Sequence, residues 1–195
     1  ALQDAPVAVM AVPSHGFRQV LQALKGQWPP ERVLLSAAKG VEIDSRLTME
    51  GVGREELGAA ALYAVLSGPS FAREVARREP TAVTIASRRR DVALRLQKIF
   101  SAPYFRVYTS NDVTGVELGG ALKNIFAIGA GILEGMGMGH NPRAALITRG
   151  LAELIRLGAR LGANPMTLAG LAGLGDLILT CTSPQSRNYS VGVKL

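Results

Sequence analysis

The chain has 195 residues, 48% of them hydrophobic, and a formal net charge of +7. This size and hydrophobic content exclude a disordered chain and allow one large globular domain or two modest ones. No 18 apolar residues follow one another without interruption, so we expect no transmembrane helix, and the N-terminus lacks the basic region of a signal peptide. The single cysteine, Cys181, excludes an intramolecular disulfide, fits a reducing cytoplasm and is expected to be buried.

The excess positive charge indicates a surface that attracts small anions such as phosphate esters. The densest basic run, Arg88–Arg90, lies where a predicted strand passes into a predicted helix, and such a run is usually a solvated turn. The basic residues do not form one tract interleaved with aromatic residues, so we expect no nucleic-acid partner.

The first half of the chain alternates between strand and helix patterns. Short apolar runs rich in β-branched residues predict strands over residues 7–12, 33–36, 63–66, 81–86 and 105–108. Helical spacing predicts helices over residues 14–24, 46–57, 71–77 and 91–100, the first of them capped by Ser14. This alternation predicts an α/β fold with a mostly parallel sheet and helices on its faces.

Beyond residue 111 no further strand is predicted, and residues 115–135, 143–162 and 165–180 have helical patterns. We therefore expect a domain boundary near residue 111, with an α/β part over residues 1–111 and a helical part over residues 112–195.

Parallel sheets bind ligands beyond the carboxyl ends of their strands. This rule selects four turns in the sequence, at residues 13–15, 38–40, 68–70 and 109–111. Lys39 supplies a cation in the second turn, and Gly68 permits close backbone approach in the third.

The helix predicted around Lys123 has two unlike faces. One is an apolar stripe of the kind a core helix needs, formed by Leu118, Leu122, Ile125, Phe126, Ile132 and Leu133. On the other face, glycine and alanine surround Lys123, although each glycine costs a helix about 1 kcal/mol relative to alanine. Either another helix packs there and Lys123 reaches solvent, or a ligand approaches its amine.

The G-x-G-x-x-G fingerprint of a dinucleotide-binding domain is absent from this chain. Gly129–Gly131 lies inside a helical pattern, and Gly173–Gly175 follows a helix instead of a strand. These physical patterns alone predict a cleft with two lysines that suits a phosphate or carboxylate, and they leave the reaction open.

Many segments, in order over essentially the whole chain, resemble the bacterial type of NAD(P)-dependent glycerol-3-phosphate dehydrogenase. They are AVPSHGFRQVL (11–21), LLSAAKGVE (34–42), VLSGPSFAREVA (65–76), PTAVTIAS (80–87), YTSNDVTGVELGGALKNIFAIGAGILEGMGMGHN (108–141), ALITRGLAEL (145–154), GLAGLGDLILTCT (170–182) and SRN (186–188). The resemblance implies the later part of a Rossmann-like parallel sheet followed by an all-α domain. It also implies an oxidoreductase that interconverts dihydroxyacetone phosphate and sn-glycerol 3-phosphate with NAD or NADP and feeds glycerophospholipid synthesis.

Carried over by position, the resemblance implies that Lys123 is the general acid/base and that Lys39 and Asp176 act beside it. It implies substrate contacts by Lys39, Gly68, Ser70, Asn124, Asp176, Thr180, Ser186, Arg187 and Asn188, and cofactor contacts by Pro13, Lys39, Ala72 and Arg187. His15 and His140 are isolated, so we expect no metal site.

These residue types suit the implied reaction. An ammonium group can stabilise the alkoxide formed by hydride transfer and then protonate it. In the reverse direction the Lys123 amine must be neutral. A second nearby cation such as Lys39 lowers the pKa of that amine and so favours its neutral form. Arg187 offers the planar donor fork that suits phosphate oxygens.

Two alternatives stay open from the sequence. One is a related two-domain reductase of another small oxo acid, and the other is a non-catalytic binding remnant that lacks the Gly-rich N-terminal unit. The choice between NAD and NADP is not readable, and the helical part would allow a homodimer.

Overall fold

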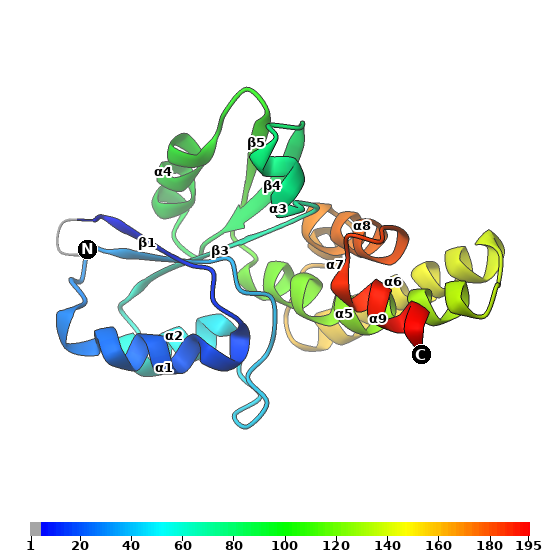
Figure 1. Cartoon of the computed structure of the whole chain (residues 1–195). Coiled ribbons are helices and arrows are strands. Elements are labelled where there is room, and N and C mark those ends of the chain that lie inside the picture. The colour runs from blue at the N-terminus through cyan, green and yellow to red at the C-terminus, as the bar shows by residue number, and fades with distance from the viewer. Residues whose placement is uncertain (1–4) are drawn as a thin grey trace.

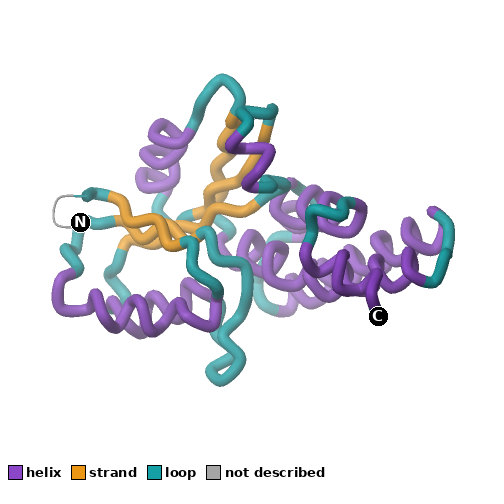
Figure 2. The backbone as a smooth tube through the Cα atoms, in the orientation of Figure 1, coloured by secondary structure: helices purple, strands orange, loops and turns teal. Residues whose placement is uncertain are grey.

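The computed structural model describes residues 5–195. Its N-terminal part is a five-stranded sheet between helices, and its C-terminal part is a cluster of helices beside one end of that sheet (Figures 1 and 2). In chain order the first part contains β1 (Val7–Met10), α1 (Ser14–Leu24), β2 (Val33–Ser36), α2 (Met49–Leu57), β3 (Leu62–Ser67), α3 (Ala72–Ala76), β4 (Thr81–Ala86), α4 (Arg90–Phe100) and β5 (Phe105–Ser110).

The sheet has the order β1-β2-β3-β4-β5, and alternate residues of its strands face two separate cores. One face packs on α1 and α2 through Phe17, Leu21, Met49 and Val52, which meet Leu34 and Val65 of the sheet. The other face packs on α4 through Val92 and Leu96, which meet Val33, Leu35 and Ile85. Both cores are apolar because each central strand is covered on both faces.

The prediction of a mostly parallel sheet is confirmed, with one antiparallel pairing at its centre. β1, β2 and β3 are mutually parallel, but β4 runs antiparallel to β3, and β5 runs parallel to β4. The connection from β3 to β4 contains only the five-residue α3, whereas a parallel crossover usually contains a full helix. The turn at residues 109–111 therefore lies at the opposite end of the sheet from the turns that follow β1, β2 and β3.

The helical part consists of α5 (Val113–Gly135), α6 (His140–Arg160), α7 (Pro165–Leu168), a π-helical turn (Leu171–Gly175), α8 (Asp176–Thr182) and α9 (Arg187–Lys194). The single helix predicted over residues 165–180 is thus three short elements, and α9 was not predicted. The expected Ser14 cap is also wrong, because Pro13 is the N-cap of α1 and no side chain caps it.

The long helix α5 buries the face that was expected to be lined by small residues. Lys123, Ala127 and Ala130 are buried, whereas Ile125 from the expected apolar stripe is 66% exposed. Small side chains on this face let neighbouring backbone come close: a Cβ added to Gly131 would lie 2.1 Å from the carbonyl oxygen of Tyr189 in α9. The expected close approach is confirmed, and its partner is protein backbone.

Two segments, α5 and Pro165–Thr182, are long and apolar enough to cross a membrane by length and composition alone. Their most apolar windows are 50% and 39% buried within the fold. Core helices of globular proteins meet the same criterion.

Candidate active site

A buried carboxylate, Asp176, lies between two lysines at the junction of the two parts of the chain. Its Oδ2 accepts a hydrogen bond from Lys39 Nζ at 2.5 Å, and its Oδ1 accepts one from Lys123 Nζ. Asp176 is 1% exposed and Lys123 is 7% exposed. A carboxylate held out of water in this way is compensated by its two cationic partners.

Local chain geometry brings Asp176 to Lys123. Lys123 lies in the middle of α5, and Asp176 is the first residue of α8, directly after the π-helical turn. That turn reaches α5 because residue 119 is glycine: an added Cβ there would lie 2.4 Å from the carbonyl oxygen of Ala172. Such π-helical turns are frequent at functional sites.

Lys39 reaches the same carboxylate from the turn that follows β2. Its aliphatic stem passes Gly120 of α5, where an added Cβ would lie 3.4 Å from Lys39 Cγ. Its Nζ also donates to the carbonyl oxygen of Gly68 at 3.1 Å. Gly68 has a φ of +147°, and Ser70 Oγ donates to the same carbonyl oxygen at 3.3 Å. The turns after β2 and β3 thus meet at one lysine, as the strand-end rule predicts.

Thr180 completes the hydrogen bonding of Lys123. Its Oγ1 accepts a hydrogen bond from Lys123 Nζ at 2.9 Å and donates to the main-chain oxygen of Asp176 at 2.6 Å. Because Thr180 lies one helical turn after Asp176, both side chains face Lys123 from α8.

The environment of Lys123 lowers the pKa of its amine from 10.5 to about 8. Burial is the largest cause, followed by the positive charge of Lys39, while Asp176 acts in the opposite direction. An amine with this pKa can hold or release a proton near neutral pH, as general acid/base catalysis requires.

Lys123 also lines a cavity of about 590 Å³ between α3 and the end of the chain. Phe71 and Ala72 contribute apolar lining, and the remaining lining residues carry polar or cationic side chains, namely Asn124, Thr180, Gln185, Ser186, Arg187 and Asn188. Ser186 caps α9 by accepting a hydrogen bond from the amide of Tyr189, so Arg187 and Asn188 stand in the first turn of that helix. Helix N-termini and arginine side chains both favour phosphate groups.

The structure brings most of the candidate residues together. Lys39, Gly68, Ser70 and Asp176 belong to the hydrogen-bonded group around Lys123 and are not among the residues that line the cavity. Pro13 is at the same end of the sheet, because its neighbour Ser14 abuts Gly40, where an added Cβ would lie 2.4 Å from Ser14 Oγ. The turn at residues 109–111 is not part of this site.

Sequence reasoning missed one contact across the cavity. Gln185 Nε2 donates to Glu74 Oε1 at 2.6 Å and thereby joins the loop before α9 to α3. Gln185 directly precedes the SRN segment, but no pattern in the sequence indicates a partner 111 residues away.

Within residues 5–195 no group of three or more His, Cys, Asp and Glu side chains could hold a metal ion. Cys181 is fully buried beside this region, as expected, and burial raises the pKa of its thiol to about 11.

Comparison with known proteins assigns both parts of the chain to one family. Residues 1–93 match the family model of the NAD-dependent glycerol-3-phosphate dehydrogenase N-terminus, and residues 112–195 match that of the C-terminus. Glycerol-3-phosphate dehydrogenase [NAD(P)+] of Geobacter metallireducens is 56% identical over 97% of this chain and 57% of its own length. The same-named protein of Oleidesulfovibrio alaskensis is 54% identical over 100% of this chain and 59% of its own length.

The fold agrees with a solved relative. The crystal structure of glycerol-3-phosphate dehydrogenase from Coxiella burnetii superposes with a TM-score of 0.94 at 44% identity, covering 98% of this chain and 58% of that one. This chain therefore spans somewhat more than half the length of the relatives that it matches.

Proposed function

Because this chain belongs to the NAD-dependent glycerol-3-phosphate dehydrogenase family, we propose that the whole protein interconverts dihydroxyacetone phosphate and sn-glycerol 3-phosphate. The observation that carries the proposal is the Lys39–Asp176–Lys123 cluster, whose Lys123 lines a cavity with side chains that suit a phosphate. The similarity to named relatives favours this reaction over the oxo acid reductase and the binding remnant.

In the proposed reaction, Lys123 exchanges a proton with the substrate oxygen at C2. In its ammonium form it stabilises the alkoxide and then protonates it, and in its neutral form it accepts the hydroxyl proton of glycerol 3-phosphate. Asp176 and Thr180 fix the direction of the Lys123 amine through their hydrogen bonds. Lys39 holds the other carboxylate oxygen and lowers the pKa of Lys123.

We assign the cavity to the substrate and to the reactive end of the cofactor. Asn124, Ser186, Arg187 and Asn188 offer donors to the phosphate group, and Thr180 lines the same cavity. Gly68 and Ser70 do not line it, and they act on the site through Lys39, which donates to the carbonyl oxygen of Gly68.

The residues of this chain also fit a nicotinamide ring, since Phe71 and Ala72 add apolar surface to the lining of the cavity. Pro13, Lys39, Ala72 and Arg187 would hold that end of NAD or NADP. When bound, the cofactor supplies or accepts the hydride.

The proposal also covers the roles of the two parts of the chain, the cellular compartment and the partners of the protein. Residues 1–111 serve mainly the cofactor, and residues 112–195 serve mainly the substrate and proton transfer. The enzyme acts in the cytoplasm without membrane insertion or a nucleic-acid partner, feeds glycerophospholipid synthesis, and is able to form a homodimer through its helical part.

The test is the loss of reduced nicotinamide absorbance in the complete protein that contains these residues. NADH and NADPH are each mixed with dihydroxyacetone phosphate, and a small oxo acid without phosphate runs in parallel. Oxidation with the phosphate ester alone is expected. Oxidation with the oxo acid alone would contradict the proposal.

A further inference from the structure

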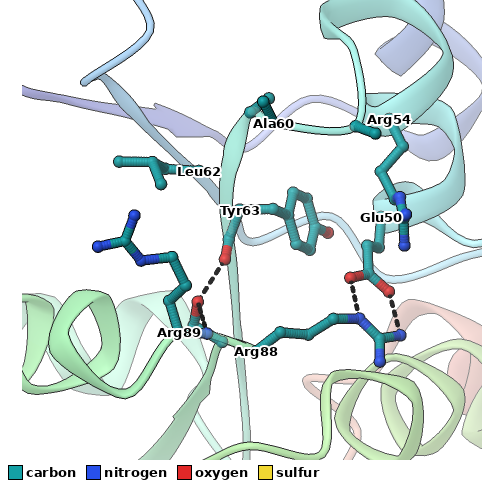
Figure 3. Close-up of a pocket in the computed structure, with 10 residues that line it drawn as sticks. Glu50, Arg54, Ala60, Leu62, Tyr63, Arg88 and Arg89 are labelled. Atoms are coloured by element: carbon teal, nitrogen blue, oxygen red, sulfur yellow. Dashed lines mark hydrogen bonds and ion pairs between the residues drawn. The ribbon is translucent and has the colours of Figure 1, made fainter.

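A second cavity, with charged side chains in its lining, lies at the opposite end of the sheet from Lys123. It has a volume of about 290 Å³ and surrounds the beginning of β3 (Figure 3). Gly68 directly follows the other end of β3, and Lys39 lies beside it. The six residues of β3 alone span about 20 Å. This cavity is therefore separate from the candidate active site.

The charged side chains that line this cavity are mostly arginines. Arg54, Arg88 and Arg89 contribute three guanidinium groups, and Glu50 contributes the one carboxylate. In Figure 3 Arg54 and Arg88 extend toward the Glu50 carboxylate from different elements, and Arg89 extends toward Leu62. The Glu50 carboxylate is already neutralised, because Arg88 donates to both of its oxygens at 2.6 and 2.7 Å.

A neighbouring cavity of about 450 Å³ continues the same surface. It shares Ser87 and Arg88 with the first cavity and adds Arg90 from the start of α4. The two cavities together are lined by four arginines and one carboxylate. Within the described part of the chain, neither Arg54 nor Arg90 has an ion-pair partner, so both guanidinium groups are available to a ligand.

The backbone between the cavities is held in place. Ser87 Oγ donates to the carbonyl oxygen of Tyr63 at 2.6 Å and accepts a hydrogen bond from the amide of Arg89. The backbone of Glu50 is also held in place, since its amide donates a hydrogen bond to Oε1 of the buried Glu117 of α5 at 2.9 Å. The arginines thus project from a rigid frame, which lowers the entropy lost on binding.

We propose that these two adjoining cavities bind a small anion with two phosphate groups, such as a diphosphate. Each cavity supplies one unpaired guanidinium group. Arg88 between them uses its Nε and Nη2 on Glu50 and can donate to the ligand from Nη1. Arginine forks match phosphate oxygens in geometry and charge. The volumes of about 290 and 450 Å³ suit a small molecule, and the ligand has no part in the hydride transfer proposed above.

The test measures binding of inorganic pyrophosphate and inorganic phosphate to the protein by calorimetry. Pyrophosphate should bind at least tenfold more tightly than phosphate, because it engages both cavities. The double variant R54Q/R90Q should weaken pyrophosphate binding on the order of tenfold or more. Both substituted side chains are exposed, and an unchanged unfolding midpoint will show that the variant is folded.

Two control variants make the result specific. R95Q removes an exposed arginine from α4 outside both cavities, and R187L removes the arginine of the candidate active site. Both should keep pyrophosphate binding within about twofold of wild type. Equal weakening by R95Q would indicate non-specific attraction, loss of binding in R187L would place the ligand in the active site, and unchanged binding in R54Q/R90Q would also refute the proposal.

Discussion

Replacing Lys123 with Met should remove one source of pH dependence from the stability of the fold. The pKa of Lys123 is about 8 in the folded protein and 10.5 for an ordinary lysine, because burial and Lys39 both disfavour its charged form. Between these values the unfolded chain binds a proton that the folded protein has released, so rising pH stabilises the folded form. The difference corresponds to about 3 kcal/mol in total, of which about 2 kcal/mol falls between pH 7 and pH 10.

Urea unfolding at pH 7 and pH 10 measures this difference in wild type, in K123M and in the control K98M, which removes an exposed lysine from α4. On going from pH 7 to pH 10, the free energy of unfolding should rise by about 2 kcal/mol more in wild type than in K123M. K98M should follow wild type. The reasoning is refuted if K123M and wild type show the same pH dependence, because Lys123 would then titrate as an ordinary lysine.

Other predictions concern packing and the cavity. Gly131→Ala should lower the free energy of unfolding by about 3 kcal/mol, because its new Cβ would meet the backbone of α9. The control Gly16→Ala, with open space around it, should stabilise the fold by about 1 kcal/mol in urea unfolding; equal losses would contradict this packing. Glu74→Ala and Gln185→Ala should each raise KM for dihydroxyacetone phosphate a few-fold, and the double variant should do no more than either, since they break one contact. Additive effects in steady-state kinetics would show that the two side chains act separately. Arg187→Leu should raise that KM at least tenfold and change kcat less; an unchanged KM would remove Arg187 from the phosphate site.

The strands and most helices of the first part were predictable because local patterns specify them. The apolar run 33–36 and the spacing of Val92 and Leu96 reflect burial directly. The direction of β4 was not predictable in the same way, because strand direction depends on how the short α3 connection returns and not on the residues of the strand. The misplaced turn at residues 109–111 follows from that one error.

In helix α5, the periodicity of the large apolar residues predicted the wrong face to be the more deeply buried one. The large residues formed an apparent core stripe, yet the side containing Gly119, Lys123 and Gly131 is the buried one. Small residues bury a helix deeply when another backbone lies against them, and the sequence of α5 alone does not reveal that the π-helical turn and α9 supply this backbone.

The site was predictable mainly through family resemblance. Lys39 and Asp176 are 137 residues apart, and no spacing rule joins them. The strand-end rule placed Lys39 and Gly68 at one edge, and the fold confirms that placement. The meeting of both lysines at one buried carboxylate depends on the π-helical turn, which periodicity did not predict.

The most direct test of the proposed mechanism compares turnover and substrate binding in the complete protein with and without Lys123. If Lys123 is the general acid/base, K123M should reduce kcat by at least about a hundredfold, while dihydroxyacetone phosphate still binds with an affinity near that of wild type. Turnover in K123M within tenfold of wild type would contradict the assignment of Lys123.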